Sequence, residues 1–299
     1  MEEKKIEIDR DLCSGCGLCK DVCPTGVISF AEGKATASGE QCISCGHCAA
    51  ICPQEAICVA ATDEEMSRYK TFTAEKQWLP PGNYNTSLLV QLMASRRSCR
   101  RYTDRPVALE ILRDLVKIGV TAPSGTNSQL WCFTLVPSRR EMVAFGEQIG
   151  NFYHRLNRIS ERAWLRTLLK WCGKPELDFY YRNYHDRIAD ALEEWRRDGR
   201  DRVFHGAPSG IIVSSSPGAS CPAEDALLAT QSILLGAHSM GLGTCLIGFA
   251  VEAIKRDPAI QNFLEIPQEE TVYSVIAIGY PAFKYHSIAG RRAPLVRSL

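Results

Sequence analysis

The order of apolar and polar residues along the chain predicts short strands and longer helices. Strands are expected where apolar residues alternate with polar ones or form short runs. The predicted strands are residues 5–9, Val27–Phe30, Ile57–Ala60, Cys132–Val136, Gly210–Val213 and Val272–Ile278. Helical spacing of apolar residues predicts helices that begin near Ser87 and run over Leu109–Thr121 and Glu224–Met240. The two kinds of element interleave without a βαβ rhythm, which favours an α+β fold over a doubly wound sheet.

Residues 140–206 are helical in pattern and rich in arginine and aromatic residues. Four arginines follow one another at spacings of three and four residues, so we expect them to share one helix face. They are Arg155, Arg158, Arg162 and Arg166. Such a face is either solvated or a basic rim that steers an acidic substrate or redox partner. The aromatic residues expected in the core, or alternatively in a substrate pocket, are Trp164, Trp171, Tyr180 and Tyr181.

Two domains joined by a linker are expected. Residues 1–61 contain all the repeated cysteines and the first three strands, and residues 88–299 contain the longer helices. Residues 62–87 mix charged residues with a Pro80–Asn83 turn sequence, which is typical of a surface linker.

Composition narrows the class of protein. The 299 residues are 45% hydrophobic and 23% charged, with a net charge of +1, so bulk charge gives no argument for nucleic acid or an anionic membrane. The amino end lacks an apolar signal-peptide core, and the most apolar region, Ala226–Val251, is interrupted by polar residues and glycines. We therefore expect a cytoplasmic protein without membrane spans, with reduced thiols at the cysteines outside the repeat.

One cysteine motif, C-x2-C-x2-C-x3-C-P, occurs twice, beginning at Cys13 and again 29 residues later at Cys42. This spacing is the bacterial ferredoxin signature, in which three cysteines bind one cluster and the fourth binds its neighbour. The expected ligands are Cys13, Cys16, Cys19 and Cys52 for one [4Fe–4S] cluster and Cys42, Cys45, Cys48 and Cys23 for the other. The alternatives are a zinc site, a thioredoxin-like CxxC or a disulfide framework. A structural zinc site usually takes its ligands from separated pairs, and a redox CxxC needs only two cysteines. A disulfide framework would need an export signal, which is not seen in this sequence.

Four later segments carry groups suited to one phosphorylated, planar ligand. Ser95–Arg101 is rich in arginine, whose guanidinium groups bind phosphate through paired hydrogen bonds. Ala122–Trp131 is a polar loop, Gly241–Gly248 is a glycine-rich turn, and an Arg291–Arg292 pair lies near the end. A dinucleotide-binding G-x-G-x-x-G would need glycine at Leu246, so no Rossmann unit is predicted.

Together and in this order, these segments resemble the nitroreductase family of FMN enzymes over residues 88–299, and the whole chain is similar to a ferredoxin–nitroreductase fusion. The resemblance implies that the arginine segments hold the FMN phosphate, the polar loop lies along the ribityl chain and flavin, and the glycine turn offers N–H groups near flavin N5 and O4. The implied residues are Arg96, Arg97, Ser98, Arg100, Arg291 and Arg292 for the phosphate, Pro123, Ser124, Gly125, Asn127 and Gln129 for the loop, and Leu246, Ile247 and Gly248 for the turn. It also implies a homodimer with FMN between the subunits.

The expected function is reduction of an electron-poor small molecule, such as a nitro-aromatic, quinone-like or conjugated compound. Electrons would come from ferredoxin or another low-potential donor, or from NAD(P)H, and the two clusters would pass them to FMN. No side-chain pattern for acid–base or nucleophilic catalysis stands out, so the chemistry is expected at FMN. The alternatives are an electron-transfer adaptor for a protein partner, and a reductive dehalogenase or desaturase on the same scaffold.

Overall fold

The computed structural model describes residues 5–38 and 41–298, which fold into two compact units. One unit comprises Met1–Lys76 and Pro123–Gln129, and the other comprises Gln77–Ala122 and Leu130–Leu299. The first unit therefore includes a short segment from the middle of the chain. The boundaries expected at residues 61 and 88 stay predictions.

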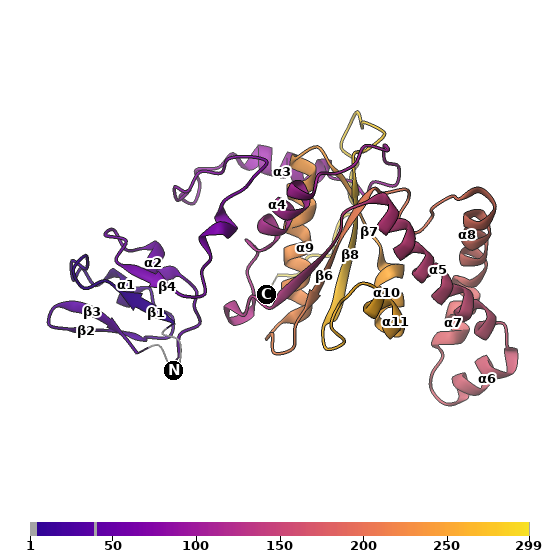
Figure 1. Cartoon of the computed structure of the whole chain (residues 1–299), viewed down its shortest axis with the longest axis horizontal. Helices are drawn as coiled ribbons and strands as arrows, with labels where there is room; N and C mark the ends of the chain where they lie inside the picture. Colours follow the sequence, from indigo (N-terminus) through magenta and orange to yellow (C-terminus); the bar gives the residue numbers. More distant parts are fainter. Residues whose placement is uncertain (1–4, 39–40, 299) are drawn as a thin grey trace. The chain divides into compact units, whose positions relative to one another are not determined.

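The first unit holds two small antiparallel sheets and two single-turn helices (Figure 1). Its elements are β1 (Ile6–Ile8), α1 (Leu18–Asp21), β2 (Ile28–Ala31), β3 (Lys34–Ala37), α2 (His47–Ala50), β4 (Ile57–Val59), η1 (Glu64–Ser67) and η2 (Gly125–Asn127). β1 pairs with β4, and β2 pairs with β3. The three strands predicted in this region are confirmed, and β3 was not predicted.

The two helices of the first unit repeat one local design. Each begins directly after a glycine with positive φ, Gly17 at 87° and Gly46 at 75°, and each buries one cysteine, Cys19 or Cys48. Glycine adopts this left-handed conformation without the steric cost that a Cβ adds. Each turn therefore carries its cysteine inward against the core formed by Ile28 and its neighbours.

The second unit is built on a four-stranded antiparallel sheet in the order β5-β6-β8-β7 (Figure 1). Its elements are α3 (Thr86–Ser95), α4 (Leu109–Gly119), β5 (Trp131–Val136), α5 (Arg139–Ser160), α6 (Ala163–Trp171), α7 (Glu176–Asn183), α8 (His185–Asp198), β6 (Ser209–Ser215), α9 (Pro222–Ser239), β7 (Gly243–Leu246), α10 (Gly248–Arg256), α11 (Pro258–Phe263) and β8 (Thr271–Gly279). The predicted helices and strands of this region are confirmed, with ends shifted by a few residues. β7 lies where the sequence indicated only a glycine-rich turn.

Both faces of this sheet are covered by helices, which explains why every residue of β6 is buried. Because side chains alternate along a strand, Ile211 and Val213 pack in the core with α4 and α9, while Ile212 packs in the core with α5 and α10. Because the sheet is antiparallel and has no βαβ crossover, this is the α+β architecture expected from the sequence. Strand β7 lies at the edge of the sheet beside β8, and its carboxyl end leads directly into α10.

Two expectations for the helical middle of the chain are wrong. The four arginines do not share one helix face, because α5 ends at Ser160 and Arg166 belongs to α6, where it stacks over Tyr181 with 3.8 Å between its Cζ and the ring centroid. Trp164 and Trp171 are not core residues, since they are 64% and 85% exposed. No helix in the described part of the chain is both long and apolar enough to cross a lipid bilayer.

Candidate functional site

Two small cavities in the first unit are each lined by four cysteines. Each group takes three sulfurs from one cysteine run and the last from the other run. One cavity is lined by Cys13, Cys16, Cys19 and Cys52, and the other by Cys42, Cys45, Cys48 and Cys23. These are the two ligand groups expected from the spacing. Over residues 5–38 and 41–298, no group of three His, Cys, Asp or Glu side chains is arranged to hold a single metal ion.

Backbone N–H groups point at several of these sulfurs. Ser44 N donates to Cys42 Sγ at 3.3 Å, and Ala56 N donates to Cys52 Sγ at 3.4 Å. Hydrogen bonds from the backbone of Ala35 and Gly15 lower the pKa of the Cys13 thiol. Because N–H donors stabilise thiolate charge, these cavities suit a thiolate-bound cluster.

The arginine segment after α3 lies against strand β7 in the second unit. Ser98 forms an isolated parallel bridge with Thr244, and Cys99 N donates to Thr244 O at 2.8 Å. Gly243 permits this approach, because a Cβ built there would lie 2.7 Å from Cys99 Cβ. The structure thereby brings two of the four predicted cofactor segments together.

A cluster of positive charge surrounds the half-buried Arg96. Burial lowers the pKa of its guanidinium, and the nearby charges of Arg291 and Arg97 lower it further. Arg291 Nη1 donates only to the backbone oxygens of Ala289 and Gly290, and no carboxylate pairs with these three arginines within the described residues. Like charges gathered without a counter-ion favour binding of an anion such as phosphate. Arg292, predicted beside Arg291, lies in the exposed carboxyl-terminal segment.

The turn from β7 into α10 contains the three residues predicted to face the flavin. Ile247 N donates to Val275 O of β8 at 2.9 Å, so this N–H is already used in a hydrogen bond to the sheet. Gly248 is exposed and begins α10, and its N–H has no acceptor in the described part of the chain. An N–H at the first position of a helix lies at the positive end of the helix dipole. Of the predicted donors, Gly248 is thus the one with a free N–H at a helix start.

A cavity of about 1980 Å³ opens beside this turn within the second unit. Leu246, Ile247 and Gly248 line it, together with Arg100. Its aromatic lining residues come from α5, α7, α8, α10, the connection between α7 and α8, and strand β8. They are Phe152, Tyr153, Phe179, Tyr180, Tyr184, Trp195, Phe249 and Tyr273. The predicted alternative for Tyr180, a place in a pocket wall, therefore agrees with its position here.

Tyr153 ties the cavity wall to the start of α10. Its hydroxyl donates to Phe249 O at 2.8 Å, and its ring stacks 6.3 Å from that of Tyr180. Burial raises the pKa of both phenols, so both remain protonated donors. The first turn of α10 is thus fixed by a side chain from α5.

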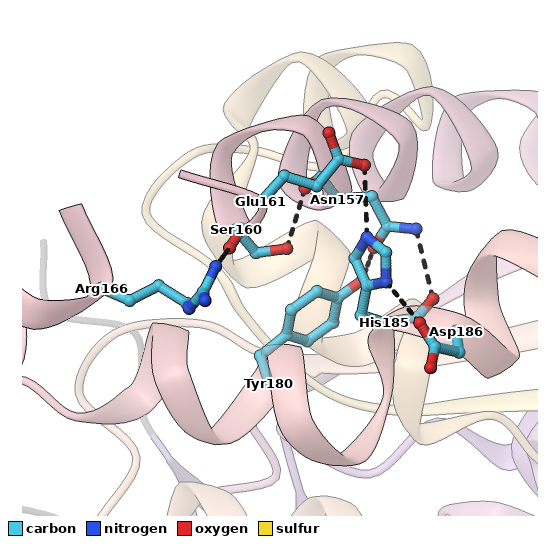
Figure 2. Close-up of polar contacts among 7 residues, drawn as sticks. All are labelled: Asn157, Ser160, Glu161, Arg166, Tyr180, His185 and Asp186. Atoms are coloured by element: carbon cyan, nitrogen blue, oxygen red, sulfur yellow. Dashed lines mark hydrogen bonds and ion pairs between the residues drawn. The ribbon is translucent and has the colours of Figure 1, made fainter. Parts of the chain in front are cut away.

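A polar network at the end of α5 connects this helix with α7 and α8, which carry part of the cavity lining (Figure 2). The buried side chain of Asn157 accepts from the Tyr180 hydroxyl and donates to His185 O at 3.4 Å. The His185 ring lies between two carboxylates, with Nδ1 2.8 Å from Asp186 and Nε2 3.3 Å from Glu161. These contacts connect α5 with α7 and α8, so the cavity wall is positioned by hydrogen bonds as well as by apolar packing.

The five predicted loop residues lie in the segment Pro123–Gln129. Pro123, Ser124, Gly125, Asn127 and Gln129 belong to the first unit, where Asn127 Nδ2 donates to Ile43 O at 3.2 Å and to Ser44 O at 3.0 Å. Their assignment to the flavin stays a prediction. The sequence did not single out Tyr153 and Phe249, because aromatic residues on a helix and at a helix start carry no pattern that separates a pocket wall from a core.

Two family models match this chain. The model of the nitroreductase family matches residues 93–280, which is more than half of the chain. The chain belongs to the nitroreductase family. The model of a 4Fe-4S dicluster domain matches residues 5–53, so the predicted fusion is confirmed. This nitroreductase-family protein is an oxidoreductase that also carries a 4Fe-4S dicluster domain, as expected.

Relatives of this nitroreductase-family chain carry different activities in their names. It is 28% identical over 206 residues to 4-nitrobenzoate reductase of Nocardioides sp. (strain LMS-CY), covering 63% of this chain and 78% of that protein. It is 25% identical over 194 residues to iodotyrosine deiodinase of Thermotoga neapolitana, covering 65% of this chain and 89% of that protein. An FMN-dependent nitroreductase from Clostridium difficile R20291 shares its fold with a TM-score of 0.51 at 18% identity, over 72% of this chain and 100% of that one.

Proposed function

We propose that this protein reduces an electron-poor small molecule with electrons taken from a low-potential donor. The clusters carry single electrons, and FMN, when bound, combines them for a two-electron reduction. The observation that carries this proposal is the presence, in one chain, of two four-cysteine cavities and an arginine cluster beside an aromatic cavity. The expected ligand groups, Cys13/Cys16/Cys19/Cys52 and Cys42/Cys45/Cys48/Cys23, are part of the proposal.

The residues near β7 fit the phosphate end of FMN. Arg96, Arg97 and Arg291 supply positive charge with no carboxylate partner among residues 5–38 and 41–298, and Ser98 and Arg100 lie on the same segment as Arg96 and Arg97. Arg292 follows Arg291 and would add a further cation. At the other end, the free N–H of Gly248 would donate to an acceptor edge of the flavin ring.

The aromatic lining of the cavity supports a planar substrate. Tyr153, Tyr180, Tyr184 and Phe249 offer ring faces and edges, which stack on or pack against an aromatic ring. Nitro-aromatic, quinone-like and conjugated compounds have this shape and accept electrons readily. The name of the 4-nitrobenzoate reductase relative agrees with a substrate of this class.

A second copy of the chain and an electron donor complete the proposal. Leu88, Val90 and Met93 on α3 are 54%, 56% and 46% exposed, and apolar residues on one helix favour burial in a homodimer. Ferredoxin or another low-potential donor would reduce the clusters, and NAD(P)H is the alternative donor. A reducing cytoplasm fits the exposed free thiols of Cys58, Cys172 and Cys221.

Anaerobic rapid mixing tests this function. The protein is purified without air, its iron and flavin are counted per chain, and it is reduced with just enough reduced ferredoxin to bleach the flavin, leaving no excess reductant. We expect the flavin absorbance to return at once when a nitro-aromatic compound or a quinone is added. Flavin that stays reduced with every such acceptor contradicts the proposal, and so does a protein that retains neither iron nor flavin after reconstitution.

Reductive dehalogenation is the second candidate, favoured by the iodotyrosine deiodinase relative. The same cavity would accept a halogenated phenol, since its lining contains both aromatic and polar residues. Product analysis separates the two candidates. Release of halide from an iodophenol, with no reduction of nitro compounds, supports this second function.

A further inference from the structure

The two cysteine loops of the first unit are held differently at equivalent positions. Gly15 in the first loop and Ser44 in the second are 29 residues apart, and both have positive φ, 72° and 55°. Glycine adopts this conformation freely, whereas a serine adopts it only with backbone strain. A contact from outside the second loop would help to hold Ser44 in this conformation.

Asn127 supplies that contact. Its amide nitrogen Nδ2 donates to Ile43 O at 3.2 Å and to Ser44 O at 3.0 Å. These carbonyls belong to the peptides between Cys42 and Cys45, and the N–H of Ser44 donates to Cys42 Sγ at 3.3 Å. In the described residues of the first loop, no side-chain amide binds Ser14 or Gly15 in this way. The clamp is thus specific to the second loop.

The backbone conformation of Asn127 suits this contact. Its own φ is 55°, a left-handed value that asparagine tolerates better than most residues. Thr126 beside it has φ of 51°, which is unusual for a β-branched residue, so the short loop is held in a strained form. Strain of this kind persists where surrounding contacts fix the backbone, and the paired bonds to Ile43 and Ser44 are such contacts.

We propose that Asn127 is a positioning residue that sets the reduction potential of the cluster held by Cys42, Cys45, Cys48 and Cys23. By fixing the carbonyls of Ile43 and Ser44, its amide keeps the Ser44 N–H directed at Cys42 Sγ. Hydrogen bonds to cluster sulfurs stabilise the more negative reduced state and raise the potential. The inference rests on the ligand groups of the proposed function.

The test is an anaerobic redox titration of the full-length holoprotein, followed by electron paramagnetic resonance. Asn127→Gly removes both donors and keeps the left-handed backbone, while Thr126→Gly is the matched control in the same loop. We expect one cluster signal of the Asn127→Gly protein to titrate at a more negative potential, with the other unchanged. The signal that moves must be the one that Cys45→Ser abolishes. Thr126→Gly should leave both potentials in place.

Unchanged potentials in Asn127→Gly, or an equal shift of both, overturn the inference. If this variant loses iron, selective loss of the Cys42 cluster supports the clamp and equal loss of both clusters contradicts it. Asn127→Ser keeps one donor, so its potential should lie between those of the wild type and Asn127→Gly. Absence of two cluster signals in the wild type would instead defeat the proposed function, so the two failures are distinct.

Discussion

Gly243 lies directly against Cys99. A Cβ built at Gly243 would be 2.7 Å from Cys99 Cβ and 2.8 Å from its Sγ, closer than real Cβ contacts allow. The pair joins β7 to the arginine segment through the adjacent bond between Cys99 N and Thr244 O, 2.8 Å long. The arginine segment can approach β7 this closely because residue 243 is a glycine and has no Cβ.

Replacing Gly243 with alanine should push the arginine segment away from β7. Overpacking of this kind costs about 1–3 kcal/mol of unfolding free energy, and we also expect weaker FMN binding. Flavin fluorescence titration and thermal unfolding measure the two effects. Gly290→Ala adds the same methyl group where no heavy atom lies within 4 Å and serves as the control. Wild-type FMN affinity in Gly243→Ala would show that the contact is not needed.

Arg96→Ala should weaken FMN binding. A hydrogen bond to a charged group contributes about 1.5–3 kcal/mol, which corresponds to roughly a tenfold to hundredfold loss of affinity. The apoprotein should be no less stable, because repulsion from Arg97 and Arg291 is relieved. The exposed Arg158 on α5 provides the control, as Arg158→Ala. Equal FMN affinity in the two variants would place the phosphate elsewhere.

Cys16→Ser should stop electrons from entering through the clusters while FMN stays bound. Cys16 lines the first four-cysteine cavity, whereas Cys58 on β4 is exposed and lines neither cavity. Reduction of the flavin by reduced ferredoxin, followed by absorbance, should fall to the background rate in Cys16→Ser and stay at the wild-type rate in Cys58→Ser. If Cys16→Ser passes electrons to the flavin at full rate, the clusters are not the entry route.

Acid should destabilise the protein in part through His205. Burial lowers the pKa of its imidazole below the ordinary value of 6.5, an effect that Arg100 and Arg202 reinforce and Asp201 opposes. The unfolded chain therefore binds a proton more readily, and stability falls as the pH drops below about 6.5.

Asn fits the φ of 58° at position 205, so His205→Asn should flatten this pH dependence. Thermal unfolding between pH 5 and pH 8 measures it, with the exposed His286→Asn as control. His238, whose pKa burial and Arg96 also lower, should account for part of the remaining slope. An unchanged pH dependence in His205→Asn would mean that this histidine keeps its ordinary proton affinity.

The cysteine groups could be predicted from the sequence because their spacing fixes local geometry. Three sulfurs at intervals of three residues wrap one side of a cavity, and the proline after the fourth directs that sulfur to the neighbour. The structure lines its two cavities with the same groups of four. The buried strands β6 and β8 could be predicted for a similar reason, since each contains a short apolar run, Ile211–Val213 in β6 and Val275–Ile278 in β8.

Strand β7 could not be predicted, because its glycine and short length are typical of a turn. It is a strand because Thr244 and Cys245 pair with Ile278 and Ala277 of β8. The break between α5 and α6 was also missed, since arginine spacing continues through it. In both cases contacts with residues far along the chain override the local pattern.

The place of the Pro123–Gln129 segment follows from long-range contacts of the same kind. The chain leaves the second unit after Ala122, contributes this segment to the first unit, and returns at Leu130. Dividing the chain at one position therefore cannot yield both compact units complete. A truncated protein ending at Lys76 would keep every cluster cysteine and still lack Asn127, so we expect it to be a poor stand-in for the same cysteines in the full chain.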